Sequence, residues 1–314
     1  MSRLAIIAAA VQFCVAFNLS AQAGTIYWTD TDGASGSHRI RSANADGSGV
    51  ATLINGRSDP RGMTLDLDND MMYWTEAGAN PPRIFRASLD GSGSQETVVT
   101  TTDGAAGVAL DLTAGKLYWT ESVAPGIDGK IRRANLDGSG VEDLVSGVLT
   151  HPAGIALDAT AGKIYWTDLE ADLDGLGRIQ RSNLDGSNVE TLISGIDEAF
   201  GLALDTVSGH IYWPDVATGK IQRADLDGNN VIDLVTGLDT PTTIGLDLAE
   251  GMMYWTDSGF GGQVNRIERA NLTGGERETI VSGDGFPWGI AVVPEPSTIF
   301  LIFTLAFVRT GRRR

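Results

Sequence analysis

The side chains best suited to chemistry in this sequence are carboxylates that recur at a fixed place. One follows each of six tryptophans by two residues, at Asp30, Glu76, Glu121, Asp168, Asp215 and Asp257. Carboxylates that meet in space can hold a divalent cation or act as a general acid and base. A group present in every copy of a motif is better suited to a structural task, because a binding site on a ring of similar units is usually asymmetric. We therefore expect these carboxylates to accept backbone N–H groups at strand ends.

Histidine and cysteine offer few other candidates for a catalytic or metal-binding group. His38, His151 and His210 fall in different copies of the repeat, and Cys14 lies in an apolar N-terminal run. Two acidic stretches, 66–70 and 172–175, hint at Ca²⁺ but lack the ligand spacing of a twelve-residue calcium loop. The sequence thus predicts no catalytic residue, no bound metal and no cofactor.

A tandem repeat positions all of these residues. Every tyrosine precedes a tryptophan, and successive tyrosines are 46, 45, 47, 47 and 42 residues apart. Each period holds four short β-branched or aromatic segments separated by turn residues such as Asp-Gly, which is typical of a propeller blade. The pairs are Tyr27–Trp28, Tyr73–Trp74, Tyr118–Trp119, Tyr165–Trp166, Tyr212–Trp213 and Tyr254–Trp255.

Six copies predict an all-β ring of six four-stranded blades over residues 24–293. The first Tyr-Trp segment has no inner strand before it, and the last inner segment, Gly289–Val293, has no Tyr-Trp segment after it. We expect these two to pair, so that the N- and C-terminal strands share one blade and close the ring. Each tyrosine and its tryptophan should point to opposite faces of their strand and be buried.

These motifs resemble the YWTD repeat, the class B repeat of low-density lipoprotein receptors, which forms six-bladed β-propellers. The resemblance covers residues 24–293 and departs mildly at Glu76, Glu121 and Pro214. The Cys-rich modules that flank such propellers in receptors are missing here, so the resemblance does not imply an endocytic receptor. It does imply that one face of the ring binds protein ligands.

The loops on that face vary most between copies. In the usual blade connectivity, the loops entering the inner strands and those following the Tyr-Trp motifs share one face, and function sits on such loops. Arginine and aromatic side chains are typical anchors of interfaces. Trp288 is the one tryptophan outside the motif; alternatively, Phe286 and Trp288 only seal the ring junction. The expected ligand-binding residues are Arg57, Asp59, Arg61, His151, Asp197, Glu198, Phe200, Phe260, Phe286 and Trp288.

Both ends have the features of sorting signals. Residues 1–23 combine a basic start, an apolar run and an Ala-Gln-Ala site, which predicts a signal peptide. Residues 294–314 hold Pro-Glu-Pro, the apolar run Ile299–Val308 and an Arg-rich end. This tail resembles a PEP-CTERM sorting signal, which implies an exported bacterial protein and processing by an exosortase-type sorting enzyme. The ten-residue run is about half of a membrane span, so we expect only transient membrane contact through the ends.

The net charge of the chain limits the classes of ligand that it can bind. The 314 residues carry 23 basic and 40 acidic side chains, a net charge of −17. Removing residues 1–23 and the tail after Pro296 takes away five basic and no acidic residues, giving −22. Such a surface disfavours nucleic acid. The leading hypothesis is an exported, non-enzymatic binding module at the cell surface or extracellular matrix, engaging a protein or glycan.

Two other functions stay open. Some six-bladed propellers are metal-dependent hydrolases, such as lactonases, and the chain could also be a purely structural matrix protein. The residues entering the six inner strands include no carboxylate or imidazole, which disfavours the hydrolase. They are Arg61, Ala106, Ala153, Phe200, Thr242 and Trp288.

Overall fold

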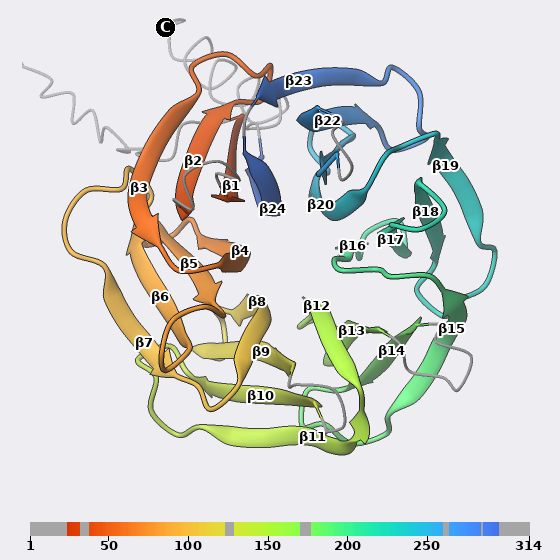
Figure 1. The fold of residues 1–314 in the computed structure, drawn as a ribbon. Coiled ribbons are helices and arrows are strands. Elements are labelled where there is room, and N and C mark those ends of the chain that lie inside the picture. The colour runs from red at the N-terminus through yellow and green to blue at the C-terminus, as the bar shows by residue number, and fades with distance from the viewer. Residues whose placement is uncertain are drawn as a thin grey trace, which may run out of the picture.

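The computed structural model describes residues 24–31, 38–122, 129–169, 177–259, 264–283 and 285–294. These residues form six antiparallel four-stranded sheets arranged as blades around a central axis, so the expected six-bladed propeller is confirmed (Figure 1). The described part of the chain holds no helix long and apolar enough to cross a bilayer.

Each blade runs from an inner strand at the axis to an outer strand at the rim. In that order, the blades are β24 (Phe286–Val293), β1 (Thr25–Thr31), β2 (His38–Asn44), β3 (Ala51–Arg57); β4 (Pro60–Asp66), β5 (Met71–Glu76), β6 (Arg83–Ser88), β7 (Glu96–Thr100); and β8 (Gly104–Asp111), β9 (Lys116–Ser122), β10 (Gly129–Asn135), β11 (Glu142–Leu149). The other three are β12 (His151–Asp158), β13 (Lys163–Leu169), β14 (Gly177–Asn183), β15 (Glu190–Ile196); β16 (Ala203–Asp205), β17 (His210–Asp215), β18 (Lys220–Asp225), β19 (Ile232–Thr236); and β20 (Pro241–Asp247), β21 (Met252–Asp257), β22 (Asn265–Asn271), β23 (Glu278–Gly283).

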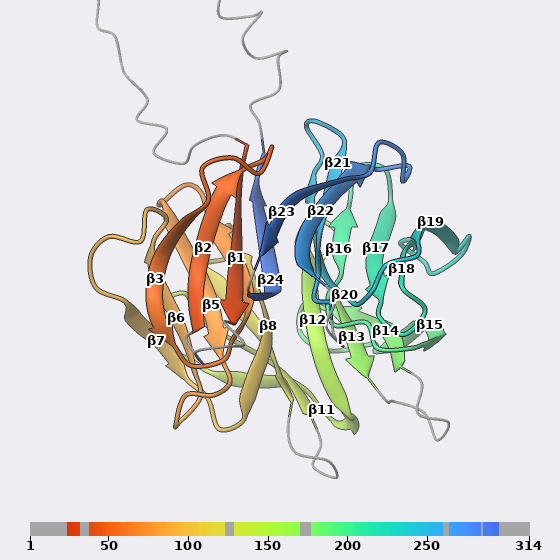
Figure 2. The ribbon, with the colours of Figure 1, turned by 45° about the horizontal axis from the view of Figure 1, so that its top comes forward.

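The ring closes by pairing the two ends of the described chain. β1 lies antiparallel to β24, with Thr25 opposite Val293 and Thr31 opposite Phe286. The closing blade therefore takes its inner strand from the C-terminal side and its other three strands from the N-terminal side, as expected. β1 begins and β24 ends on the same face of the ring, which is the upper edge in Figure 2.

The repeated aromatic pair fills the spaces between blades. Each tyrosine packs in the same apolar cluster as the tryptophan of the next blade, as Tyr118 does with Trp166. All six tryptophans of the motif are at most 1% exposed and all six tyrosines at most 5%. Burying 150–250 Å² per ring contributes about 4–6 kcal/mol each, as a gross upper limit. Alternation along one strand thus joins two neighbours at once, which is why the motif needs both rings.

The carboxylates after the aromatic pair are buried and hydrogen-bonded. Asp168 accepts the backbone N–H groups of Thr150 (3.0 Å) and His151 (2.8 Å), which holds the chain entering β12. The longer Glu121 instead reaches back along its own strand to accept the indole N–H of Trp119 (2.8 Å). Both contacts are what a structural carboxylate at a strand end should make, since a buried charge requires hydrogen-bond partners.

The Asp-Gly turns touch the neighbouring blade. Gly138, between β10 and β11, has a φ of +83°, and a Cβ placed on it would lie 1.8 Å from the carbonyl oxygen of Val98 in β7. Gly186 lies in the same way against Leu144 of β11. Glycine is therefore required at these turns both for the left-handed backbone and for the close approach of two blades.

Candidate functional site: the mouth of the ring

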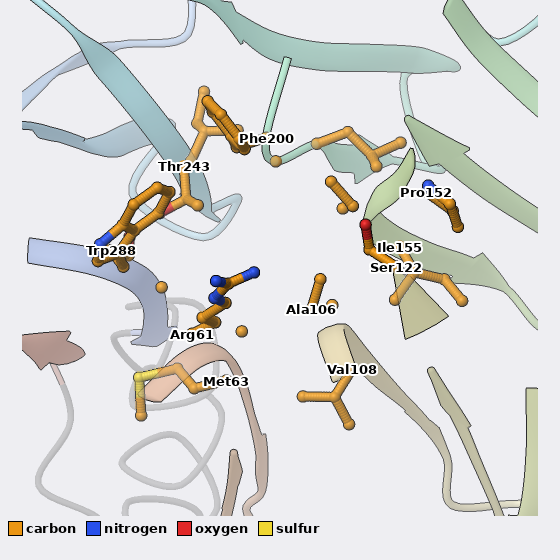
Figure 3. Close-up of a pocket in the computed structure, with 18 of the residues that line it drawn as sticks. Arg61, Met63, Ala106, Val108, Ser122, Pro152, Ile155, Phe200, Thr243 and Trp288 are labelled. Atoms are coloured by element: carbon orange, nitrogen blue, oxygen red, sulfur yellow. The ribbon is translucent and has the colours of Figure 1, made fainter. Parts of the chain in front are cut away.

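The inner strands begin around a hollow on the axis, which we call the mouth. It encloses a cavity of about 310 Å³, and its wall is largely apolar, with few polar side chains. Figure 3 shows Phe200 and Trp288 on one side, and Pro152, Ile155 and Ser122 on the other. Concave apolar cavities with a few polar groups are the usual form of binding sites.

Threonines of the Tyr-Trp motif fix the backbone of this mouth. The hydroxyls of four of them donate to the carbonyl of the residue that enters the inner strand of the next blade. In several blades the same hydroxyl also accepts the backbone N–H of its own inner strand, as Thr120 does from Gly107 (2.8 Å). We call this set of contacts the threonine belt. Its donor–acceptor pairs are Thr29 and Arg61 (2.8 Å), Thr75 and Ala106 (2.8 Å), Thr120 and Ala153 (2.7 Å), and Thr256 and Trp288 (3.0 Å).

An aromatic pair forms one side of the mouth. The rings of Phe200 and Trp288 meet edge to face, with centroids 5.3 Å apart and planes at 88°, a favourable aromatic geometry. Thr243 lies beside both rings in Figure 3, and its hydroxyl donates to the carbonyl of Trp288. The inner strand carrying Trp288 is thus held in place, while its indole stays partly exposed.

Arg61 supplies the positive charge of the mouth. Its guanidinium points into the cavity in Figure 3 and pairs with Asp59 at 2.9 Å. Both side chains keep substantial exposure, 41% and 34%. An ion pair this exposed is worth little by itself, so a ligand carboxylate or carbonyl can compete for the guanidinium.

His151 lies across the cavity at the start of β12. Its backbone N–H is held by Asp168, and its ring contributes to the cavity wall. Its ring Nδ1 is buried without a hydrogen-bond partner among the described residues. The mouth therefore presents one guanidinium, one imidazole and two aromatic rings on a rigid frame.

The structure separates the expected ligand-binding residues into two sets. Arg61, His151, Phe200 and Trp288 line the cavity. The other described members lie outside its lining: Arg57, Asp59, Asp197, Glu198 and Phe286. Phe260 falls outside the described residues.

Arg57 lies outside the lining of the cavity because its side chain is held by other contacts. Its guanidinium pairs with Glu76 (3.3 Å), lies 5.7 Å from the ring centre of Phe85, and its side chain is only 15% exposed. The carbonyls of Asp197 and Glu198 accept the N–H groups of Ala217 and Val216. These contacts hold the loops rather than presenting the side chains to the cavity.

Within the described residues, neither the acidic stretch 66–70 nor the mouth forms a cation site. Asp66 accepts the backbone N–H (3.1 Å) and side-chain amide (2.8 Å) of Asn69 and so closes a turn. Residues 172–175 fall outside the described ranges. Within those ranges, no three His, Cys, Asp or Glu side chains converge. The side chains at the mouth can stack on a ligand and donate charge-assisted hydrogen bonds to it.

Sequence reasoning missed the residues that build the mouth's frame. In the sequence, the threonine after the Tyr-Trp pair recurs in five of the six copies, and the glycine of the inner strand also recurs in five of six. The expectations drawn from the repeat concern only its carboxylate and its aromatic pair. A Cβ on Gly107 would lie 2.4 Å from the carbonyl oxygen of Ala153, so the blades also approach closely where the belt ties them. The signal is a fixed spacing, because the threonine directly follows the tryptophan and the glycine precedes the tyrosine by 11 residues, as Gly107 precedes Tyr118.

The repeat is matched by a known family model. The model of the low-density lipoprotein receptor repeat class B matches residues 115–159, 162–206 and 251–292, and each match starts near a Tyr-Trp strand and ends near the next inner strand. Three stretches of the chain thus match the class B repeat. All three lie within the six-bladed ring described above. A curated relative, low-density lipoprotein receptor-related protein 1 of Pyricularia oryzae, is 38% identical over 71 residues. That match covers 21% of this chain and 23% of the relative, so the chain spans less than a quarter of that protein.

Solved structures share the fold of this ring. A chain in the crystal structure of a nidogen/laminin complex superposes with a TM-score of 0.69 at 23% identity, covering 86% of this chain and 98% of that one. TolB from Acinetobacter baumannii gives 0.68 at 16% identity, over 87% and 67% of the two chains. A putative TolB from Agrobacterium tumefaciens gives 0.62 at 13%, over 87% and 99%. At these identities the likeness concerns the fold.

Proposed function

We propose that this ring is a non-enzymatic binding module that captures a protein ligand at its mouth. The observation that carries the proposal is the Phe200–Trp288 pair beside Arg61 in a concave cavity, since aromatic and arginine side chains dominate the affinity of interfaces. The similarity in fold to a chain from a nidogen/laminin complex supports a protein rather than a small molecule as ligand.

The ligand chemistry follows from the mouth. A protruding loop with an acidic or amide side chain fits Arg61, and an adjacent apolar side chain fits the aromatic pair. Because the threonine belt holds the backbone of Arg61 and Trp288, little ordering is required when the ligand binds. A preformed site of this kind loses less free energy on association than a mobile one.

A displayed library of random linear peptides, selected on the intact protein, tests this proposal. Selected peptides should bind Trp288→Ala and Phe200→Ala at least tenfold more weakly in calorimetry, while Val207→Ala, on the opposite face, binds as the parent does. Thermal melting of each variant separates lost binding from lost folding. Peptides that bind Trp288→Ala and Phe200→Ala as tightly as the parent protein would contradict a mouth-centred site. Selective binding to a glycan array with the same dependence on Trp288 would make the ligand a glycan.

We further propose that the protein is exported and sorted through its two ends. Residues 1–23 have the order of a signal peptide, and the Pro-Glu-Pro, apolar and Arg-rich order of 294–314 supports an exosortase-type processing step. Intact-mass measurement of the protein from its host tests both cuts. A mature N-terminus at Gly24 and loss of the apolar run are expected; an uncut chain inside the cell would contradict export.

A further inference from the structure

One face of the ring gathers the turns opposite the mouth. It holds the hairpin turns that join each inner strand to the Tyr-Trp strand and the Asp-Gly turns of the outer hairpins. The described chain also starts and stops there, because the backbone N–H of Gly24 donates to the carbonyl of Val293 (3.2 Å). We call it the exit face (upper edge of Figure 2).

Exposed aliphatic side chains concentrate on the exit face. Among the described residues, eleven large hydrophobic side chains are exposed by 38% or more, and only Val148 and Val264 of these lie on the side of the mouth. Val207 is the most exposed of all, at 90%. Single exposed aliphatics need no explanation, but nine on one face of a ring do. They are Val50, Leu67, Leu112, Val141, Val189, Val207, Val231, Ile232 and Leu248.

The same face is negatively charged. The exposed aspartates of the Asp-Gly turns have a pKa below the usual carboxyl value, because a neighbouring side chain and backbone N–H donate to them, as Ser48 does to Asp46. They stay ionised at neutral pH and would be repelled by an anionic lipid surface. A surface without net charge accepts the aliphatic side chains and does not repel the carboxylates. The equivalent turn aspartates are Asp46, Asp90, Asp137, Asp185 and Asp227.

The chain beyond Val293 is short before it becomes apolar. Five residues, including Pro294 and Pro296, separate Val293 from the apolar run Ile299–Val308. A fully extended chain of this length spans about 20 Å at most. The apolar run has about half the length of a spanning helix, so its hold on a bilayer is weak, and a second contact made by the tethered ring adds to it.

We propose that, before the tail is cut, the exit face rests on a zwitterionic lipid surface while the apolar run is inserted in that surface. This rests on the export and tail function proposed above. The mouth then points away from the membrane, at a height set by the inner strand. The eight residues of β24 span about 26 Å, so the mouth stands about 26 Å above the lipid. A membrane-held ring in this orientation offers its binding site to partners outside.

Paired single-cysteine labels test the orientation on the chain from Gly24 to Arg314. Val207→Cys on the exit face and Val264→Cys beside the mouth replace exposed valines (90% and 59%) in this chain, which has no other cysteine. Each label carries an environment-sensitive fluorophore, and phosphatidylcholine vesicles contain a nitroxide lipid as quencher. We expect quenching at position 207 to exceed that at position 264 at least threefold. A chain ending at Pro296 should lose the quenching at both.

Three results would overturn the proposal. Equal quenching at the two positions would mean that the ring has no preferred orientation. Stronger quenching at position 264 would place the mouth against the lipid. If the chain does not bind the vesicles at all, the apolar run does not hold the ring at the lipid surface. None of these affects the selection of peptides on the mouth, so failure here is distinguishable from failure of the binding function. Phosphatidylglycerol vesicles at low salt should weaken the quenching at position 207, and unchanged quenching there would contradict the role given to the turn aspartates.

Discussion

The blade β12–β15 and its neighbour β16–β19 are built from the same repeat, yet their inner strands differ. In the first, β12 has eight residues, and the N–H of Gly154 donates to the hydroxyl of Thr167 (2.9 Å). In the second, proline replaces that threonine at position 214, and β16 has only three residues. Both blades bury their aromatic pair fully. The blades therefore pack against each other without the belt threonine, but the inner strand of the blade that lacks it is shorter.

The chemistry of proline explains the difference. Pro214 has neither a hydroxyl to join the belt nor an N–H for strand pairing. Residues 200–202, which lie next to it in the blade, are therefore not part of a strand, although the equivalent residues of the other blades are. Phe200 stands on this freed segment and meets Trp288 across the mouth. One substitution in a sixfold scaffold thus accompanies the asymmetry that a binding site requires.

The largest expected effect tests the shared part of the two blades. Trp166→Ala and Trp213→Ala should each lower the free energy of unfolding by about 3–5 kcal/mol, because both indoles are 0% exposed and truncation leaves a cavity between blades. Denaturant titration of each variant measures this. A loss below about 1 kcal/mol for Trp213→Ala alone would show that the proline blade is loosely packed, and the comparison would then concern the whole blade rather than its inner strand.

A smaller effect should separate the blades. Thr167→Val keeps the shape of the side chain but removes the acceptor for the Gly154 N–H, which becomes a buried donor without a partner. We expect a loss of about 1–3 kcal/mol in the free energy of unfolding. Thr52→Val, at an exposed position of β3, is the matched control and should change stability by less than about 0.5 kcal/mol. If the two substitutions change the free energy of unfolding equally, the hydrogen bonds of the belt do not contribute to stability.

Restoring the belt in the proline blade should change local order more than stability. Pro214→Thr supplies the missing hydroxyl and N–H, worth about 1 kcal/mol each, but frees the unfolded chain by about 0.4–1 kcal/mol. The net gain should be about 1–1.6 kcal/mol. Hydrogen exchange is the sharper measurement, and the amides of residues 200–202 should become protected like those of residues 153–155. Unchanged exchange would show that something other than Pro214 shortens β16.

Sequence patterns could predict the ring because its determinants repeat. Six aromatic pairs at nearly constant spacing give the blade number, and the unmatched first and last segments give the closure of β24 on β1. The mouth depends on single substitutions and loop conformations, which carry no repeat signal. Arg57 and Arg61 look alike in sequence, but the first turns to Glu76 and only the second reaches the cavity. Predicting that choice requires knowing where Glu76 lies in three dimensions.

The smallest expected effect concerns the Asp-Gly turns, where the two blades should behave alike. The pKa of Asp185 is lowered first by the Ser187 hydroxyl (2.6 Å) and then by the Ser187 N–H, and the pKa of Asp227 first by the N–H of Asn229. Ser187→Ala should raise the pKa of Asp185 towards its ordinary value and leave Asp227 unchanged, as followed by NMR titration of the carboxyl carbons. Asn229→Ala is the reciprocal control and should move Asp227 less, because the N–H that acts most strongly there is kept.

The sign of the pH dependence follows from the direction of these shifts. A carboxyl whose pKa is lower in the folded chain stabilises the fold above its unfolded value near 3.9, and this contribution disappears as the pH falls through the lower, folded value. The parent ring should therefore lose stability below about pH 4, and Ser187→Ala should lose less over that range because its starting contribution is smaller. If Ser187→Ala and the parent fall together, the backbone N–H alone lowers the pKa, and the serine and asparagine turns of the two blades are equivalent in this respect too.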